Sequence, residues 1–355
     1  MNHIAQIAAK LPEYGLDAML ITSQSGERYA LGFHGEGLLL VTREGGHYTT
    51  DGRYIEAAQE QVTGVELSLV SQGSGGHLAQ AKAYIQEKGL HNVGFESGSL
   101  TVDAHRRYAQ ELACILTPAQ PLLDELRAAK DEEELAIMRR AQKITDDTFK
   151  AILDFIRPGM TEREIAARIV YELLRRGGER VSFDPIVASG PNGSRPHAVP
   201  GDQVVDTGMF ITMDFGCVKD GYCSDMTRTV ALGQPTEEME QVYSIVLAAQ
   251  KAGINAARAG IPGREVDAAG RKVIADAGYG PYFSHSFGHS LGVDIHESPN
   301  ASPSETTLLP AGAVISAEPG IYLPGRFGVR IEDVLILREG GCEDITHSPK
   351  DLIVL

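Results

Sequence analysis

The sequence predicts a two-domain protein, with an α/β domain over residues 1–124 and an α+β domain over residues 125–355. A chain of 355 residues is long enough for about two domains. In the first part, short apolar strands alternate with helices, which is typical of an α/β layer architecture. In the second part, the sequence at the start of one helix, around Glu164, is similar to the sequence around Glu265, which indicates two similar α+β halves.

The composition is that of an ordinary globular protein, with 43% hydrophobic and 23% charged residues. The formal net charge of −16 argues against a nucleic-acid or anionic-membrane partner. No apolar run approaches the ~18 residues of a membrane-spanning helix. Met1–Lys10 also lacks the apolar core of a signal peptide. We therefore expect a cytoplasmic protein.

The first domain is predicted to contain two paired strands that flank Arg43-Glu44-Gly45. His34 lies in a glycine-rich loop, where an ordinary loop residue is the favoured interpretation. A place at the lip of a substrate site is the alternative, and Arg53 is a second candidate for that lip. The predicted elements are helices 5–14, 51–60, 78–87 and 102–112 and strands 18–22, 37–41, 46–50 and 91–96.

A charged stretch, Arg127–Glu134, lies at the predicted domain boundary and leads into a long amphipathic helix over 132–156. Pro158-Gly159 ends this helix, and Thr161–Glu164 has the pattern of a capping box that starts the next one. A similar phrase, Pro262–Ala269, starts a later helix. The recurrence indicates an internal duplication in which two α+β halves pack their strands together.

The stretch Phe210–Val230 is predicted to form a buried β-hairpin around Lys219-Asp220-Gly221. Asp214 and Asp225 lie on opposite arms. If Lys219-Asp220 is the turn, they pair directly; if Asp220-Gly221 is the turn, Asp225 faces Gly216. Both registers place the two carboxylates on one face of the hairpin, where like charges repel. We therefore expect a cation between them rather than a solvated polar pair.

Three further candidate ligands follow. His289 lies between glycines in a segment with two more histidines, which argues against three satisfied structural residues. Glu318 ends an apolar strand before a sharp Pro-Gly turn. Glu332 lies in a core strand, where an unpaired carboxylate is costly. An ion pair with Arg330 and a metal ligand are both compatible with that position.

Together these side chains predict a dinuclear metal site. Four carboxylates and one imidazole would be balanced by two divalent cations, with carboxylates bridging the ions. Oxygen-rich ligation with one imidazole favours Mn²⁺, with Co²⁺, Fe²⁺ or Zn²⁺ as alternatives. Such a metal pair lowers the pKa of a shared water and holds it as hydroxide for attack on a carbonyl. The candidate ligands are Asp214, Asp225, His289, Glu318 and Glu332.

These motifs resemble those of the metallopeptidases with the pita-bread fold, which include methionine aminopeptidase, aminopeptidase P and prolidase. The ligand order matches, as do the phrases MDFG, SDMTRT, GHSLG, AEPGIY and VRIED. Ser182–Ala198 resembles the family's segment with a catalytic histidine. The N-terminal half, with Asp51–Tyr54, is similar to the creatinase-type domain of the proline-specific members. The resemblance covers essentially the whole chain, with the creatinase-type domain over 1–124 and the pita-bread domain over 125–355.

The resemblance implies a metal-binding role for each ligand. Asp214, Asp225 and Glu332 would hold one ion, and the second would be held by Asp225, His289, Glu318 and Glu332. Asp225 and Glu332 would bridge the two. Glu318 would also take the proton from the attacking water and pass it towards the leaving nitrogen.

The resemblance also implies substrate contacts. His197 would hydrogen-bond the substrate carbonyl or the scissile amide and stabilise the tetrahedral intermediate. His285 and His296 match accessory histidines that line the pocket, and His296 is in addition a catalytic candidate. Tyr322 and Arg330 match a tyrosine and an arginine near the substrate.

The implied activity is hydrolysis of the Xaa-Pro bond at the N-terminus of a peptide. The bond to proline is a tertiary amide without N–H. Proteases that bind substrates as extended strands therefore lose a backbone hydrogen bond at this position. An Xaa-Pro aminopeptidase that also accepts dipeptides is favoured, with an Xaa-Pro dipeptidase (prolidase) as the alternative. The expected partners are proline-containing peptides and a second copy of the chain. A non-catalytic interaction protein or a metal-free amidinohydrolase of this fold is disfavoured, because all five ligands are present.

Overall fold

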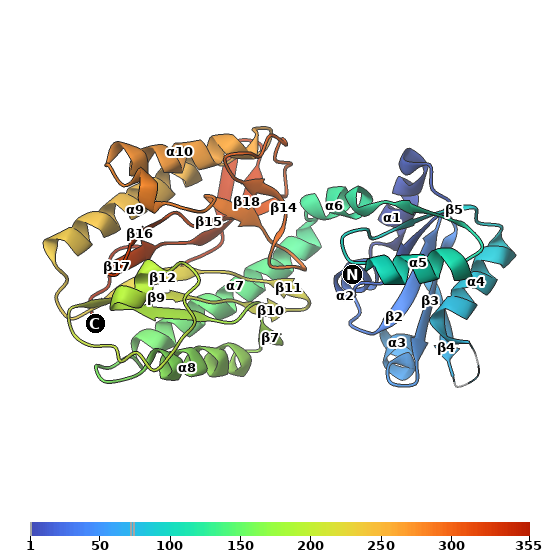
Figure 1. The fold of residues 1–355 in the computed structure, drawn as a ribbon, viewed down its shortest axis with the longest axis horizontal. Helices are drawn as coiled ribbons and strands as arrows, with labels where there is room; N and C mark the ends of the chain where they lie inside the picture. Colours follow the sequence, from blue (N-terminus) through green and yellow to red (C-terminus); the bar gives the residue numbers. More distant parts are fainter. Residues whose placement is uncertain (1, 72, 74) are drawn as a thin grey trace. The chain divides into compact units, whose positions relative to one another are not determined.

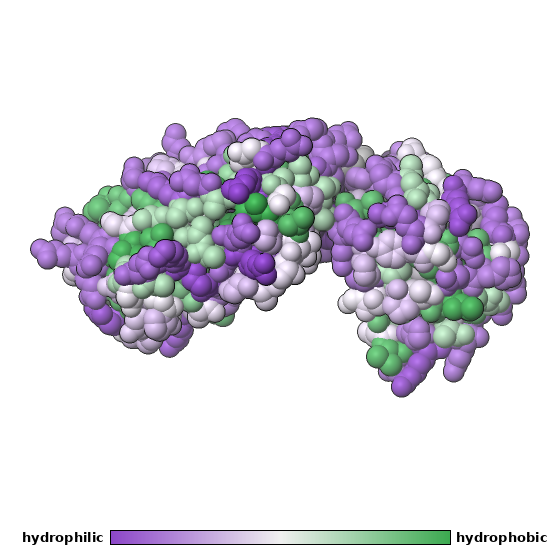
Figure 2. Space-filling model, turned by 90° about the horizontal axis from the view of Figure 1, so that it is seen from above, coloured by the Kyte–Doolittle hydropathy of each residue, from purple (hydrophilic) through white to green (hydrophobic). Residues whose placement is uncertain are grey.

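The computed structural model describes residues 2–71, 73 and 75–355. It divides into two compact units, Met1–Arg127 and Ala128–Leu355, which are shown in Figure 1. Hydrophilic side chains cover much of the face of each unit seen in Figure 2, with apolar patches between them. Among the described residues, every helix is too short or too polar to cross a lipid bilayer.

The first unit is built on a mixed six-stranded sheet with the order β4-β3-β2-β1-β5-β6. β1 pairs antiparallel with β2 and parallel with β5. Leu20 and Leu40 of this sheet pack in one core cluster with Leu78 and Ile85 of α4. The strands are β1 Ala18–Ile21, β2 Gly37–Thr42, β3 Gly45–Asp51, β4 Val65–Val70, β5 Asn92–Phe95 and β6 Ile115–Pro118.

The helices of this unit include four of the predicted elements and two that the sequence did not predict. The two missed helices are α2 and α6, and the strands β4 and β6 were missed as well. β4 has partly exposed side chains along its length, so it lacks the continuous apolar run that marks a buried strand. The helices are α1 Ile4–Lys10, continued by the 3₁₀ turn Leu11–Tyr14, α2 Gln24–Leu31, α3 Ile55–Gln61, α4 Gly76–Lys88, α5 Val102–Glu111 and α6 Gln120–Ala128.

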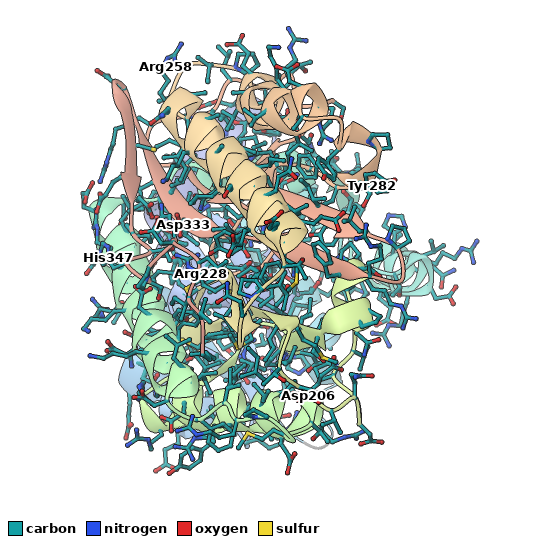
Figure 3. All side chains as sticks on the ribbon, turned by 90° about the vertical axis from the view of Figure 1, so that its left-hand side faces the viewer. Asp206, Arg228, Arg258, Tyr282, Asp333 and His347 are labelled. Carbon is teal, nitrogen blue, oxygen red and sulfur yellow. The ribbon has the colours of Figure 1, made fainter. Side chains whose placement is uncertain are left out.

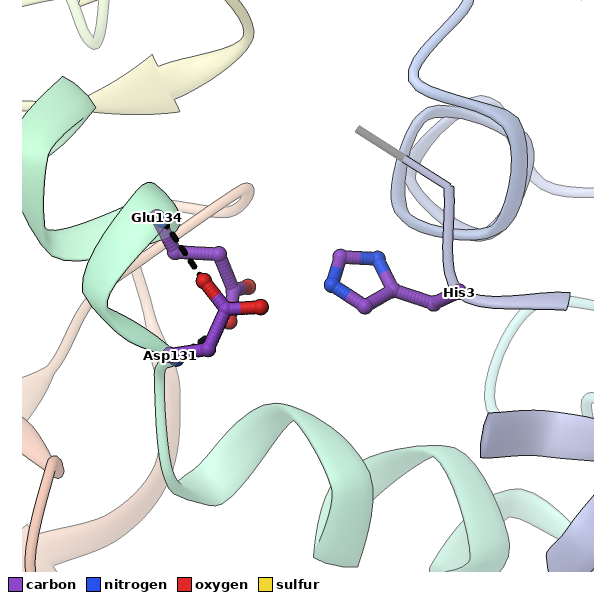
Figure 4. A group of neighbouring side chains, drawn as sticks. All are labelled: His3, Asp131 and Glu134. Carbon is purple, nitrogen blue, oxygen red and sulfur yellow. Dashed lines mark hydrogen bonds between the residues drawn. The ribbon is translucent and has the colours of Figure 1, made fainter. Parts of the chain in front are cut away.

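Two pairs of helices organise the second unit. α7 (Glu132–Leu153) and α8 (Glu162–Arg175) each begin with a capping box. At α7, the Asp131 carboxylate accepts the Glu134 N–H at 2.9 Å and the Glu134 carboxylate accepts the Asp131 N–H at 2.7 Å (Figure 4). α9 (Glu237–Ala256) and α10 (Gly263–Asp276) repeat this helix order before a second set of strands, which is the arrangement that the predicted duplication requires.

Antiparallel strands fill the space between these helices, in the orders β12-β9-β8, β14-β13-β15-β18-β19, β11-β10-β7 and β16-β17. Phe149 of α7 and Ile165 of α8 pack in one core cluster with Ile211 and Met213 of β9. The strands are β7 Arg180–Val181, β8 Ile186–Ser189, β9 Met209–Asp214, β10 Cys217–Lys219, β11 Tyr222–Cys223, β12 Thr227–Leu232, β13 Gly288–Ser290, β14 Glu297–Ala301, β15 Val314–Ala317, β16 Gly320–Leu323, β17 Phe327–Arg330, β18 Asp333–Arg338 and β19 Gly341–Asp344.

The predicted hairpin has Asp220-Gly221 as its turn. β10 and β11 pair Lys219 with Tyr222, and the continuing strands pair Asp214 with Thr227. Asp220 and Gly221 both have positive φ, at 47° and 84°, as the tight hairpin turn that favours Asp-Gly requires. The register with Lys219-Asp220 as the turn is therefore wrong, and Asp225 lies diagonally across from Asp214.

A buried ion pair, between Arg228 of β12 and Asp333 of β18, joins the two halves of this unit (Figure 3). The Arg228 side chain is 1% exposed and donates to Asp333 at 2.7 Å and to the carbonyls of Ser348 and Pro349 at 2.8 and 2.9 Å. Burial alone would raise the pKa of Asp333, but the charges of Arg228 and Lys350 hold it below its usual value. Arg228 thus ties β12 to the C-terminal segment.

We expect Arg228→Met to destabilise the protein by about 3–5 kcal/mol, because it leaves the Asp333 carboxylate buried without its main partner. Urea unfolding of the metal-free protein measures this change in the free energy of unfolding. Arg258→Met, on an exposed arginine of the same unit, is the matched control and should change it by less than about 0.5 kcal/mol. Equal free energies of unfolding for the two variants would contradict the predicted contribution of the buried ion pair to stability.

Candidate metal centre and active site

A cavity of about 510 Å³ in the second unit includes in its wall nine of the ten site residues that the sequence singled out. The tenth, Tyr322, is buried behind the wall and hydrogen-bonds to His285 and Arg330. The structure therefore brings the whole predicted set together. The nine residues are His197, Asp214, Asp225, His285, His289, His296, Glu318, Arg330 and Glu332.

The ends of strands position the carboxylates. Asp214 is the last residue of β9, and Asp225 lies in the short connection from β11 to β12. Gln142 of α7 fixes the backbone of Asp225, since its side chain donates to the Asp225 carbonyl at 2.9 Å and accepts the Asp225 N–H at 3.3 Å. Glu318 follows β15, and Glu332 lies between β17 and β18. The four carboxylates, each at or next to the end of a different strand, thus meet in one place.

The orientation of His289 fits a metal ligand. Its Nδ1 lies 3.1 Å from the Ser290 carbonyl, which can only accept, so Nδ1 carries a proton. In the neutral ring, Nε2 then presents its lone pair. Nε2 lies 3.5 Å from Asp225 Oδ2 and 3.4 Å from Glu318 Oε1. A ring lone pair and two carboxylate oxygens repel one another unless a proton or a metal cation lies between them, and a shared metal ion is the usual arrangement at metal sites.

The unpaired oxygens of the site point to the same conclusion. Asp214 Oδ1, Asp225 Oδ1 and Glu332 Oε1 are buried without a hydrogen-bond partner in the described part of the chain. Asp225, His289 and Glu332 each offer one ligand atom, and these atoms lie within 4.8 Å of one another. Buried carboxylates without donors are costly unless they are paired or coordinate metals. The residues present therefore fit divalent cations with oxygen-rich ligation.

The electrostatics of the cluster also favour positive charge. Burial and the neighbouring Asp214 charge raise the pKa of Asp225, and burial and the Asp225 charge raise that of Glu332. Burial raises the pKa of Asp214 as well, against the opposing effect of Arg330. Without cations, this cluster holds protons that it would release on binding metal.

We expect the stabilisation by divalent metal to grow as the pH rises. The raised pKa values mean that the metal-free native state binds more protons than the unfolded chain above about pH 4, so its stability falls as the pH rises through those native values. Metal binding requires the deprotonated carboxylates and removes this loss. The check is the difference in Tm between Mn²⁺-loaded and chelated protein across pH. A difference that does not change with pH would contradict the assignment.

Arg330 does not form an ion pair with Glu332, the arrangement that the sequence had left open. Its Nη2 donates to Asp214 at 2.7 Å, and its Nε donates to Thr227 Oγ1 at 3.0 Å. Thr227 Oγ1 in turn donates to Glu332 at 2.7 Å. The reason is geometric: the chain changes strand between Arg330 and Asp333, so the alternation of one regular strand does not hold across Glu332.

The two accessory histidines lie in the cavity wall, and His285 is held there by hydrogen bonds. His285 Nδ1 lies 2.8 Å from the Ser286 carbonyl, and its Nε2 lies 2.8 Å from the Tyr322 hydroxyl. Burial lowers the pKa of His285 and also that of His296, which favours neutral rings near pH 7. His296 packs edge-on against the His289 ring at 4.4 Å. Both nitrogens of His285 are therefore already engaged, whereas the neutral His296 ring can hydrogen-bond a neutral peptide group.

Some of the cavity wall was not predicted from sequence. Phe183, Ile186 and Ile295 give it an apolar side, and Asp184 and Val199 also line it. Ile186 pairs with Asp214 across β8 and β9, so the two side chains share a face. Residues 184 and 186 are two positions apart, so an extended chain places both side chains on one face. The sequence alone did not show that β8 pairs with β9, and so did not show that this face lines the cavity.

Comparisons with known proteins match both parts of the chain to known families. Residues 136–339 match the model of metallopeptidase family M24, and residues 3–129 match the creatinase/prolidase N-terminal domain. An uncharacterized peptidase of Bacillus subtilis is 42% identical over 97% of both chains.

Two solved structures resemble the whole chain. A structure titled Xaa-Pro dipeptidase, from Bacillus anthracis, has a TM-score of 0.95 at 39% identity and covers 99% of both chains. The X-Pro aminopeptidase of Thermotoga maritima has a TM-score of 0.92 at 34% identity and covers 100% of both. These matches confirm the predicted creatinase-type N-terminal domain and pita-bread catalytic domain. The chain belongs to metallopeptidase family M24, in the group that includes Xaa-Pro dipeptidases and X-Pro aminopeptidases.

Proposed function

We propose that this metallopeptidase hydrolyses the Xaa-Pro bond of dipeptides at a site for two divalent cations. The observation that carries the proposal is the convergence of four carboxylates and one imidazole on one cavity, with three buried oxygens left unpaired. The similarity to the solved dipeptidase of Bacillus anthracis supports the dipeptide as substrate. The residues that would hold the cations are Asp214, Asp225, His289, Glu318 and Glu332.

Bound divalent cations would supply an activated water nucleophile and polarise the carbonyl of the scissile bond. The chain's own residues would handle the proton and the developing charge. Glu318 is only partly buried and its Oε1 accepts a hydrogen bond from Ser316 at 3.1 Å, which orients the carboxylate to take a proton and deliver it to the prolyl nitrogen. His197 is exposed in the cavity wall and would donate to the carbonyl oxygen as it becomes negative.

The cavity also suits the shape of the substrate. The prolyl nitrogen carries no N–H and its ring is rigid, so recognition depends on apolar surface and on the carbonyl rather than on strand pairing. Phe183, Ile186 and Ile295 would supply the apolar surface. His285 and His296 would contact the peptide groups through neutral rings.

An Xaa-Pro aminopeptidase is the second candidate, and the engagement of Arg330 favours it. A dipeptide ends in a carboxylate, for which an arginine is the matched partner. Arg330 is the only Lys or Arg of the described residues in the cavity wall. It already donates to Asp214, Thr227, Tyr322 and the Pro196 carbonyl. A peptide that continues beyond proline would need no free cation there.

Three substrates separate these candidates: Ala-Pro, Ala-Pro amide and Ala-Pro-Ala. The amide removes only the terminal charge, and the tripeptide moves it. A dipeptidase should cleave Ala-Pro with a kcat/KM at least about tenfold above the other two, a difference of about 1.4 kcal/mol. Equal or faster cleavage of the amide and the tripeptide would make the aminopeptidase the right assignment. Cleavage of none by metal-loaded protein would contradict both.

Other parts of the proposal are the expectations drawn from the sequence. Oxygen-rich ligation favours Mn²⁺, with Co²⁺, Fe²⁺ or Zn²⁺ as alternatives. The division into domains 1–124 and 125–355, a homodimer and a cytoplasmic location stay predictions. So do the lip roles of His34 and Arg53; in the first unit, Arg53 forms exposed ion pairs with Asp51 and Glu36 at 2.8 Å.

A further inference from the structure

A buried carboxylate outside the cavity holds the segment that carries His197. Glu162, the first residue of α8, is 0% exposed. Its Oε1 accepts from the Ser189 N–H at 2.7 Å and from the Ser189 hydroxyl at 2.9 Å. The Asn192 amide donates to both oxygens at 3.2 Å. Oε2 also accepts the Gly201 N–H at 3.3 Å. One side chain thus joins both ends of segment 189–201.

Capping of α8 does not account for this carboxylate. Thr161 accepts the Glu164 N–H at 3.2 Å, and the Glu164 carboxylate accepts the Thr161 N–H at 2.7 Å. This capping box satisfies the helix start without Glu162. The Glu162 side chain is therefore committed to segment 189–201, through charge-assisted hydrogen bonds that are stronger than neutral ones. The positive end of the α8 dipole favours its charge at this position.

Other contacts also hold the segment, but none of them involves the His197 side chain. The Arg163 N–H donates to the Gly201 carbonyl at 3.1 Å, Ser189 pairs with Ile211 of β9, and the Gly325 N–H donates to the Ser194 hydroxyl at 3.2 Å. Arg330 donates to the Pro196 carbonyl at 3.3 Å, and local backbone bonds link Asn192 to Arg195 and Arg195 to Ala198. His197 itself is exposed and forms no hydrogen bond with any residue in the described part of the chain. Its place in the cavity wall therefore depends on where the two ends of the segment are fixed.

We infer that Glu162 is a positioning residue for His197: it sets the segment so that the imidazole faces the scissile carbonyl. The inference rests on the proposed function, in which His197 stabilises the developing oxyanion. Glu162→Gln keeps the shape but replaces one acceptor oxygen with an NH₂ group, which faces a donor instead of accepting from it. One of the hydrogen bonds that Glu162 makes to the segment is then lost, and the remaining backbone bonds hold that end less tightly.

The test compares Glu162→Gln with wild type under saturating Mn²⁺, using Ala-Pro as substrate. We expect kcat to fall by up to about 10²-fold, the cost of a displacement of about 1 Å at a catalytic group. KM and bound metal should change by less than about twofold, because the ligands lie on other segments. Glu164→Gln is the matched control: it removes a carboxylate from the same helix turn and should leave kcat unchanged. Glu162→Asp, which keeps the charge, should recover part of the loss.

A double-mutant cycle separates positioning from general damage. If Glu162 acts through His197, Glu162→Gln should cause no further loss of kcat in a His197→Ala background. An equal fold loss in both backgrounds would overturn the inference while leaving the role of His197 intact. An unchanged kcat in His197→Ala alone would instead contradict the proposed function. If Glu162→Gln does not fold, Ser189→Ala removes only the hydroxyl donor and should give a smaller loss with the same dependence on His197.

Discussion

Asp225→Asn is expected to abolish metal binding and to lower kcat/KM by at least about 10³-fold. Metal ions supply several kcal/mol of transition-state stabilisation, and each ~1.4 kcal/mol is a factor of ten in rate. Asp225 lies within ligand distance of both His289 and Glu332, so an amide at this position removes charge from the centre of the site. Elemental analysis of the purified variant measures bound metal, and release of proline from Ala-Pro measures activity.

The same variant should not be misfolded. Because burial and the Asp214 charge raise the pKa of Asp225, a neutral amide relieves repulsion in the metal-free protein. The metal-free variant should therefore unfold at the same urea concentration as wild type or at a higher one. Asp206→Asn is the control for charge, since Asp206 is exposed in the same unit and outside the cavity wall (Figure 3). Retention of two bound ions by Asp225→Asn would refute its role as a shared ligand.

His197→Ala should lower kcat by about 10²–10³-fold, the usual cost of losing one donor to a developing oxyanion. Bound metal and urea stability should be unchanged, because the side chain is exposed and is not a candidate ligand. KM should change little if the contact strengthens only in the transition state. His347→Ala, at an exposed histidine outside the cavity wall (Figure 3), is the matched control. An unaltered kcat in His197→Ala would leave this histidine without a catalytic role.

The candidate ligands could be predicted from sequence because each lies in a local pattern. The Asp-Gly turn placed Asp214 and Asp225 on one face whichever register formed. The register itself could not be chosen, since that depends on the positive φ of Asp220. The partner of Arg330 could not be predicted from sequence either. One strand ends at Arg330 and the next begins at Asp333, so the alternation of side chains along a single strand, which suggested a pair with Glu332, does not apply.

Residues that act through contacts distant in sequence were missed. The pattern at Thr161–Glu164 predicted the capping box of α8, yet nothing in it showed that Glu162 reaches Ser189 and Gly201. The short elements α2, α6, β4 and β6 were missed in the first unit, because none of them has a long, regular apolar pattern and their stability comes from the sheet around them. Periodicity reports a buried face, and β4 and β6 have little of one. α2 does bury residues, but Gly26 and Glu27 are among them, so its sequence shows no apolar stripe.

The most direct measurement is a titration of exhaustively chelated protein with Mn²⁺, following bound metal and the release of proline from Ala-Pro in the same samples. We predict negligible hydrolysis without metal and a rise in rate as up to two ions bind per chain, with a plateau once the site is full. Full hydrolysis by metal-free protein, or no hydrolysis with both ions bound, would contradict a metal-dependent Xaa-Pro peptidase.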